Sequence, residues 1–181
     1  MSRYEIRMAG VGGQGLILAG QILAEAAAIF GGKYAVQTQS YAPLARGAPS
    51  KSEIIIDTEE VDYPKVEVPD LLLVLSQDAY EKHIKTVKDD TVIIVNSNEV
   101  NIHGESGTDR KSMIHKVPLE DLSRSATGKN FAASIAALGF ISCLTGIVSI
   151  DSLKMAIEKR APKGTVEINI KALEEGFKAC S

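Results

Sequence analysis

The sequence predicts an α/β protein, a Rossmann-like three-layer fold in which helices cover a largely parallel sheet. Predicted strands and helices alternate along the chain, and a glycine-rich turn joins the first strand to the first helix. Two segments, 71–76 and 91–97, are almost continuously apolar, as expected of strands buried on both faces. With 181 residues, 45% hydrophobic and 24% charged, we expect a single domain over residues 1–181.

The first part of the chain alternates between apolar segments and turns. Residues 4–10 alternate in polarity and then meet glycines, which indicates the first strand. An Ala/Leu/Ile-rich helix over 13–30 is expected to end at Gly31-Gly32. Two further strands flank a loop that is rich in glycine and proline: strand 33–41, loop 42–50 and strand 51–57.

Capping residues indicate where the later helices begin. Ser76 can cap a helix over 77–87, Ser149 one over 150–160, and Asn130 the apolar segment 131–150. Between them, residues 98–111 are expected to form a loop and 112–118 a short edge strand. A last helix over 166–180 is predicted from one apolar stripe at helical spacing, made of Val166, Ile170, Leu173 and Phe177.

Charge and hydropathy exclude several classes of partner. The net charge of −3 and the lack of a basic run argue against nucleic acid. Segment 131–150 is uncharged and long enough to span a bilayer, but serines and glycines interrupt it. We expect a buried helix there, no membrane association, and a partner subunit that helps to cover it. The two cysteines and a charged N-terminus predict a reduced, cytoplasmic protein.

Gly10, Gly12 and Gly15 have the spacing of a dinucleotide-binding turn, G-x-G-x-x-G. ATP hydrolysis is excluded because Leu16 and Ile17 stand where a P-loop needs Lys and Ser/Thr. NAD is disfavoured because the second strand ends on residues 37–40 without a carboxylate. Two alternatives remain open: the glycines let the loop pass close to another backbone, or they bind an anionic group.

The second unusual stretch is 38–54, which follows the second strand. Ser40 and Tyr41 are expected at the same sheet edge as the glycine loop, where open α/β folds bind ligands. Arg46, next to Gly47, is either a solvated charge or a contact to a carboxylate or phosphate. The histidines, the cysteines and the carboxylates of residues 59–62 show no spacing typical of a metal or acid–base site.

A set of motifs spread along nearly the whole chain resembles the gamma subunit of 2-oxoacid:ferredoxin oxidoreductases. They are AGVGGQG, TQSYAPLARG, VDYP, PDLLLVLSQDAY, GKNFAASIAALG and EINIKALEEGF, in this order. The stretch TQSY-x-P-x-ARG followed by SEI is most similar to the 2-oxoglutarate, or general 2-oxoacid, branch. Ala42, Leu44 and Ala48 depart from that branch, and RGAP (46–49) also resembles the pyruvate branch.

The resemblance implies a subunit of an enzyme that converts a 2-oxoacid and coenzyme A to an acyl-CoA and CO2 and reduces ferredoxin. It implies thiamine diphosphate, Mg2+ and iron–sulfur clusters in partner subunits of alpha, beta and delta type, and none on this chain. Two cysteines are too few for a four-cysteine cluster. We therefore expect no catalytic or metal-binding residue here.

Contacts with the catalytic subunits and coenzyme A are expected from one set of residues: Gly12, Gly13, Gln14, Gly15, Ser40, Tyr41, Arg46 and Gly47. In this hypothesis Gln14 offers an amide at the loop tip and Arg46 a cation for the coenzyme A phosphates. The alternatives are a self-contained NAD(P)-binding enzyme and a free-standing scaffold that binds an acidic metabolite.

Overall fold

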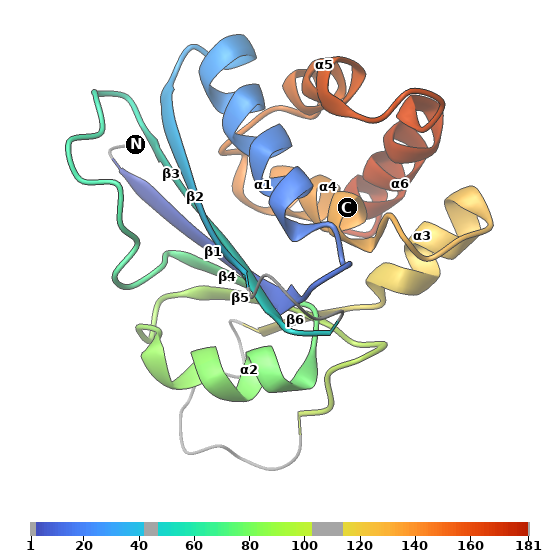
Figure 1. Ribbon diagram of the computed structural model, residues 1–181, viewed down its shortest axis with the longest axis horizontal. Helices are drawn as coiled ribbons and strands as arrows, with labels where there is room; N and C mark the ends of the chain where they lie inside the picture. Colours follow the sequence, from blue (N-terminus) through green and yellow to red (C-terminus); the bar gives the residue numbers. More distant parts are fainter. Residues whose placement is uncertain (1–2, 42–46, 103–113, 181) are drawn as a thin grey trace.

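One six-stranded sheet in the order β2-β3-β1-β4-β5-β6 organises the molecule (Figure 1). The computed structural model describes residues 3–41, 47–102 and 114–180. The strands are β1 (Tyr4–Val11), β2 (Tyr34–Tyr41), β3 (Pro49–Asp57), β4 (Leu71–Val74), β5 (Val92–Asn96) and β6 (Ile114–Val117). The helices are α1 (Leu16–Glu25), α2 (Gln77–His83), α3 (Leu119–Thr127), α4 (Ala133–Thr145), α5 (Ile150–Arg160) and α6 (Val166–Lys178).

The sheet is mostly parallel, as the sequence predicts. β1 pairs with β4, β4 with β5 and β5 with β6 in parallel. β3 lies between β1 and β2 and is antiparallel to both. The first two strands of the chain are therefore not neighbours, which the order of apolar segments in the sequence does not reveal.

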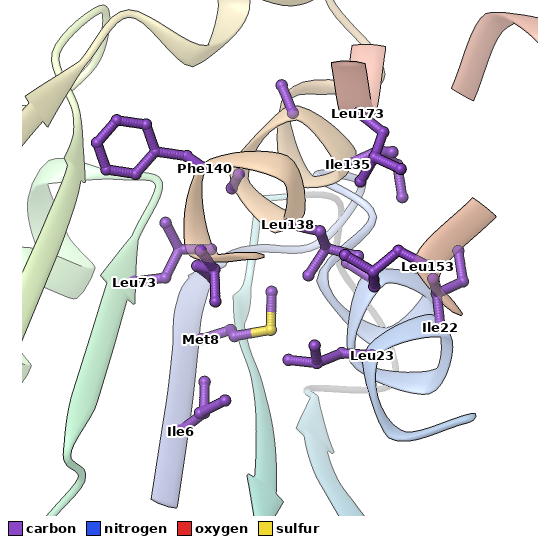
Figure 2. Packing of buried hydrophobic residues seen from close by; sticks show 14 of the residues in the cluster. Ile6, Met8, Ile22, Leu23, Leu73, Ile135, Leu138, Phe140, Leu153 and Leu173 are labelled. Atoms are coloured by element: carbon purple, nitrogen blue, oxygen red, sulfur yellow. The ribbon is translucent and has the colours of Figure 1, made fainter. Parts of the chain in front are cut away.

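Helices cover the two faces of the sheet unequally. Figure 1 shows α1, α4, α5 and α6 on one face, with α3 beside them, and α2 on the other. On the face with most helices, Ile6, Met8 and Leu73 of the strands meet Leu138 of α4 and Leu23 of α1 (Figure 2). All five side chains are buried, which makes this layer the main apolar core.

Helix α4 is the centre of that core and needs no partner subunit to cover it. Every residue from Ala133 to Ser142 is buried. A side chain at Gly139 would overlap the carbonyl of Leu173 in α6, and one at Gly176 would overlap Ala136. For the helix itself the expected partner is not needed, because α6 packs backbone to backbone against it, whereas Phe131 before the helix remains exposed. Within the described part of the chain, no helix combines the length and apolar character of a bilayer span.

Two of the three predicted helix caps are confirmed. The Ser76 hydroxyl accepts the Ala79 N–H at 3.4 Å, and the Ser149 hydroxyl accepts the Ser152 N–H at 3.1 Å. Asn130 is not a cap, because α4 begins at Ala133 and no described side chain caps it. The chain around Asn130 instead forms the turn between α3 and α4.

Several element boundaries differ from the prediction, and one helix is new. Helix α1 begins at Leu16, because residues 12–15 form the glycine turn, and it continues as a π-helix over Ala26–Phe30. The predicted loop 42–50 is shorter, since β3 already begins at Pro49. Helix α3 lies in a segment with few apolar residues, which is why periodicity did not indicate it.

The second face of the sheet carries ionic groups beside its apolar residues. Arg7 of β1 is 7% exposed, and its Nε donates to the Glu53 carboxylate of β3 at 2.7 Å. The same guanidinium donates to the Val66 carbonyl at 2.7 Å, so it also holds the chain between β3 and β4. Lys51 completes the group through a 2.9 Å contact with Glu53.

Candidate functional site

The candidate site lies at the sheet edge where β1, β4 and β5 end. The helix that follows β1 covers one face of the sheet, and the helix that follows β4 covers the other (Figure 1). Because the two connections leave in opposite directions, a crevice opens between the ends of these neighbouring strands. Ligands of open α/β sheets bind at such a point, so its geometry decides what the glycine loop can do.

The glycine loop is fastened to its own chain at this edge. The Gly12 N–H donates to the Ala48 carbonyl at 2.8 Å, which joins the glycine loop to the segment that precedes β3. The Gln14 side-chain oxygen accepts the Val11 N–H at 2.8 Å, and its nitrogen donates to the Leu75 carbonyl at 3.1 Å. The expectation that Gln14 offers its amide at the loop tip is therefore wrong, because both ends of that amide hold the ends of β1 and β4 together.

Internal packing accounts for one of the loop glycines, and backbone conformation accounts for two others. A side chain at Gly10 would overlap the Gln14 amide oxygen, so Gly10 makes room for the bridge between the strand ends. Gly13 and Gly15 have φ values of 99° and 74°, which L side chains rarely adopt. Of the glycines in the G-x-G-x-x-G pattern, close approach within the chain thus explains Gly10, and backbone conformation explains Gly15.

The second loop ends at the same edge, but farther along it. In the sheet register Gly10 lies opposite Ser50, and Ser50 lies opposite Tyr41. The end of β2 is thus two strands from β1, about 10 Å at ordinary strand spacing. Gly47 directly precedes Ala48 and has a φ of 85°. Arg46 and the side chain of Tyr41 lie outside the described residues.

This strand order bears on the NAD alternative. A dinucleotide site needs the second strand beside the first, so that its end can reach the ribose. Here the reversed strand β3 occupies that place. The exposed Ser40 therefore lies beside Lys51 of β3 and not beside a nucleotide on the glycine loop.

A hollow of about 220 Å3 opens beside the glycine loop. Residues from five segments line it: Gly13, Gln14, Leu75, Asn96, Glu120, Asn130, Phe131 and Ala133. Asn96, at the end of β5, is 1% exposed. Its side-chain nitrogen lies 3.5 Å from the Glu120 carboxylate of α3. The polar groups that line the hollow are thus amides and a carboxylate.

A buried serine holds the turn that carries Asn130 and Phe131. The Ser123 hydroxyl donates to the Lys129 carbonyl at 2.8 Å and accepts the Ala132 N–H at 3.2 Å. With its backbone held in this way, the turn presents Phe131 with 48% of the side chain exposed. The Lys129 ammonium lies 5.9 Å from the centre of the Phe131 ring.

Sequence reasoning did not indicate Asn96, Glu120 or Phe131 as site residues. The signal available was that Asn96 directly follows a buried strand, since polar residues at such strand ends share one edge. Among the described lining residues there is no cation. The hollow therefore suits neutral polar and aromatic contacts better than a phosphate group.

The remaining candidate groups lie away from this edge. His83 ends α2 and is half-buried above the second face; burial, aided by the charges of Arg7, Lys82 and Lys51, lowers its pKa to about 4. His115 is on the edge strand β6, with its ring 5.8 Å from that of Phe140. In the described residues, no group of three or more His, Cys, Asp or Glu side chains is placed to hold a metal ion.

Comparison with known proteins gives consistent matches over nearly the whole chain. Residues 5–179 match the family described as pyruvate ferredoxin/flavodoxin oxidoreductase. The 2-oxoglutarate synthase subunit KorC of Methanocaldococcus jannaschii is 43% identical, over 97% of this chain and 92% of that protein. The common gamma subunit of the pyruvate/ketoisovalerate oxidoreductases of Pyrococcus abyssi is 33% identical, over 96% and 95%.

A solved structure agrees with these relatives. The gamma subunit of a keto/oxoacid ferredoxin oxidoreductase from Geobacter sulfurreducens superposes with a TM-score of 0.85 and 40% sequence identity. The superposition covers 99% of this chain and 97% of that one. The similarity therefore extends over nearly the whole of both chains.

Proposed function

Because the chain belongs to the pyruvate ferredoxin/flavodoxin oxidoreductase family, as the gamma subunit of a 2-oxoacid:ferredoxin oxidoreductase, we propose that its complex acts on 2-oxoglutarate. The support is the difference in identity between the 2-oxoglutarate relative, 43%, and the pyruvate/ketoisovalerate relative, 33%. In this proposal the complex converts 2-oxoglutarate and coenzyme A to succinyl-CoA and CO2 and passes two electrons to ferredoxin.

The chain's own part in this reaction is proposed to be structural. Thiamine diphosphate, Mg2+ and the iron–sulfur clusters belong to partner subunits in this proposal, since a four-cysteine cluster needs more cysteines than the two in the sequence. Residues 1–181 act as one domain that docks on those subunits. Thermal unfolding of the isolated chain in a single transition would agree with one domain.

The proposed docking surface is the edge with the glycine loop and the hollow. One observation carries this: Phe131 stands half-exposed on a turn whose backbone is fixed by the buried Ser123. A rigidly presented aromatic side chain beside a hollow is the usual form of an interface anchor. The glycine loop at the same edge has small side chains, and hydrogen bonds of Gly12 and Gln14 hold it in place. Both properties suit close packing against another subunit.

Coenzyme A contact is proposed for the second loop and not for the hollow. The hollow has the Glu120 carboxylate and no described cation, so the coenzyme A phosphates would be repelled there. Arg46 is the cation nearest in sequence to the bridged segment at Ala48. In this proposal the Arg46 guanidinium binds the coenzyme A phosphates.

Native purification of the complex with two single variants tests the docking surface. Phe131→Ala is expected to lose most of its co-purification with the iron–sulfur subunits, because the anchor is removed. Ile29→Ala is the matched control, since Ile29 is 53% exposed and belongs to the π-helix at the opposite end of α1. Full assembly of the Phe131→Ala complex would exclude this edge as the docking surface.

Steady-state kinetics of ferredoxin reduction test the role of Arg46. The Arg46→Ala complex is expected to assemble normally and to show a KM for coenzyme A raised about 10-fold, the loss of one charge-assisted contact. The KM for 2-oxoglutarate should remain unchanged. Wild-type kinetics together with intact assembly would end the proposal for this residue.

A further inference from the structure

The outermost strand β2 presents a long hydrogen-bonding edge at one side of the sheet. It pairs with β3 over its whole length without a bulge, from Tyr34 opposite Asp57 to Tyr41 opposite Ser50. Among the described residues, no further strand follows β2 in the sheet order. In an antiparallel ladder, every second residue of such a strand points its N–H and C=O away from its neighbour. β2 therefore offers a row of donors and acceptors to one more strand.

The opposite edge of the sheet has the features that protect an edge from pairing, and β2 lacks them. β6 has four residues, its middle residues are His115 and the exposed Lys116, and Pro118 follows it directly. Short length, lysine and proline are usual means by which proteins blunt an exposed edge. β2 has eight residues, and its sequence YAVQTQSY contains no charged residue and no proline. The β2 edge thus has the character of an interface.

Contacts on both sides hold β2 in its extended form. The Gln37 side-chain nitrogen donates to the Ser52 hydroxyl of β3 at 2.9 Å. Ser52 is fully buried, and a side chain at Gly20 of α1 would overlap it, so this side of β2 faces α1. On the other side of β2, Val36 lies beside the buried Ile55 of β3. Because the strand is already ordered, pairing with it costs little conformational entropy.

We propose that the β2 edge binds the β2 edge of a second copy of this chain, in antiparallel pairing about a two-fold axis. The sides that face α1 in the two copies then lie on the same face of a continuous sheet. This requires a residue in the middle of the strand to lie opposite itself, and Gln37 and Thr38 are the two residues at that position.

The uncharged sequence of β2 favours a second copy over a different partner. An axis at Gln37 sets Val36 opposite Thr38 of the second copy, and an axis at Thr38 sets Gln37 opposite Gln39 of the second copy. Only uncharged side chains meet in both arrangements. A charged strand would instead repel itself, since like charges would meet near the axis.

The proposed dimer is compatible with docking on other subunits. The β2 edge runs along the side of the sheet, whereas the proposed docking surface lies at the ends of β1, β4 and β5. A complex built on this contact would contain two copies of the chain. Because one pair of eight-residue strands buries less area than a standard interface, we expect a dissociation constant in the micromolar range.

Light scattering of the isolated full chain tests the pairing. As the concentration rises through the micromolar range, the measured mass is expected to rise from that of one chain towards twofold. Hydrogen exchange should become slower in the peptide that contains β2 and should stay unchanged in the peptide that contains β6. A chain that stays monomeric throughout would overturn the proposal. So would β2 amides that are protected only in the assembled complex, because a strand of another subunit would then cover the edge.

Substitutions at Thr38 test whether β2 itself forms the contact. Thr38→Lys is expected to abolish the dimer, since the two lysines would lie on the axis or one residue from it. Thr38→Val is the matched control, because it keeps an uncharged β-branched side chain and should dimerise like the wild type. Circular dichroism checks that the lysine variant is folded, and Gln39→Lys, at an exposed position of the same strand, replaces it if it is not. A dimer that persists in a folded lysine variant would overturn the proposal, because another surface would then hold it.

Discussion

The two faces of the sheet are built in different ways. On one face, α1, α4, α5 and α6 bury an apolar layer that includes Met8 and Leu138. On the other, α2 covers the middle strands, and an ionic group of Arg7, Glu53 and Lys51 lies over the strands next to it. The first face is stabilised by burial of apolar surface. The second is stabilised in part by buried charges, each of which needs a partner of opposite charge.

Because of this difference, different kinds of substitution destabilise the two faces. An apolar layer loses stability in proportion to the volume that a substitution removes. A buried ionic group loses most when only one partner is removed, because the other charge is left without compensation. Three experiments can break or sharpen the comparison, from the largest expected effect to the smallest.

Leu138→Ala tests the apolar face. Leu138 is fully buried in the middle of α4, so the substitution leaves a cavity and is expected to lower the free energy of unfolding by about 3–4 kcal/mol. Urea unfolding of the isolated chain measures it. Ile29→Ala, at an exposed position, should change stability by less than about 0.5 kcal/mol. Equal effects at the two positions would contradict the assignment of the core.

Glu53→Ala tests the ionic face. It leaves the buried Arg7 guanidinium with the Val66 carbonyl but without its carboxylate, so the free energy of unfolding is expected to fall by about 3 kcal/mol. The double substitution Arg7→Met with Glu53→Met removes both charges and should lose less than Glu53→Ala alone. If the double variant is the less stable one, the pair contributes through attraction and not merely through mutual compensation.

The pH dependence of stability tests how His83 meets this ionic group. Burial and the charges of Arg7, Lys82 and Lys51 lower its pKa from 6.5 to about 4, with Glu53 acting in the opposite direction. Between pH 6.5 and pH 4, His83 is therefore protonated in the unfolded state but neutral in the folded state. The free energy of unfolding consequently decreases as the pH falls from 6.5 to 4. His83→Gln should remove up to about 1 kcal/mol of that loss, a small effect because the half-exposed ring is screened by solvent. A profile of unfolding free energy against pH that is identical in wild type and variant would exclude this role.

The apolar face was largely predictable from the sequence, and the second face was not. The continuous apolar segments at 71–74 and 92–96 and the caps Ser76 and Ser149 are local signals, and each appears where expected. The insertion of β3 between β1 and β2 depends on pairing between distant segments, for which the sequence carries no local mark. The same holds for Arg7 and Glu53, which look like ordinary surface charges in strands.

The candidate edge was predictable in outline only. Its position follows from the rule that parallel strands end together, which the glycine loop and Asn96 both obey. The hydrogen bonds by which the Gln14 side chain joins the ends of β1 and β4 could not be predicted, because one of them needs the Leu75 carbonyl, which directly follows β4. Phe131 was missed because the apolar segment around it suggested a helix interior, whereas α4 begins two residues later.

The reversed strand β3 also sets the order in which the sheet can assemble on the ribosome. β2 and β3 are joined by a short segment and can pair as soon as both emerge, a local contact that forms fast. β1, although synthesised first, acquires its partners only when β3 and then β4 have followed. Until β3 has been made, the apolar side of α1, which packs on β3 and β2, has no sheet to cover. A nascent chain halted before residue 49 is therefore expected to expose this helix and to depend on chaperones, whereas one halted after β3 should already bury the side of α1 that faces the sheet.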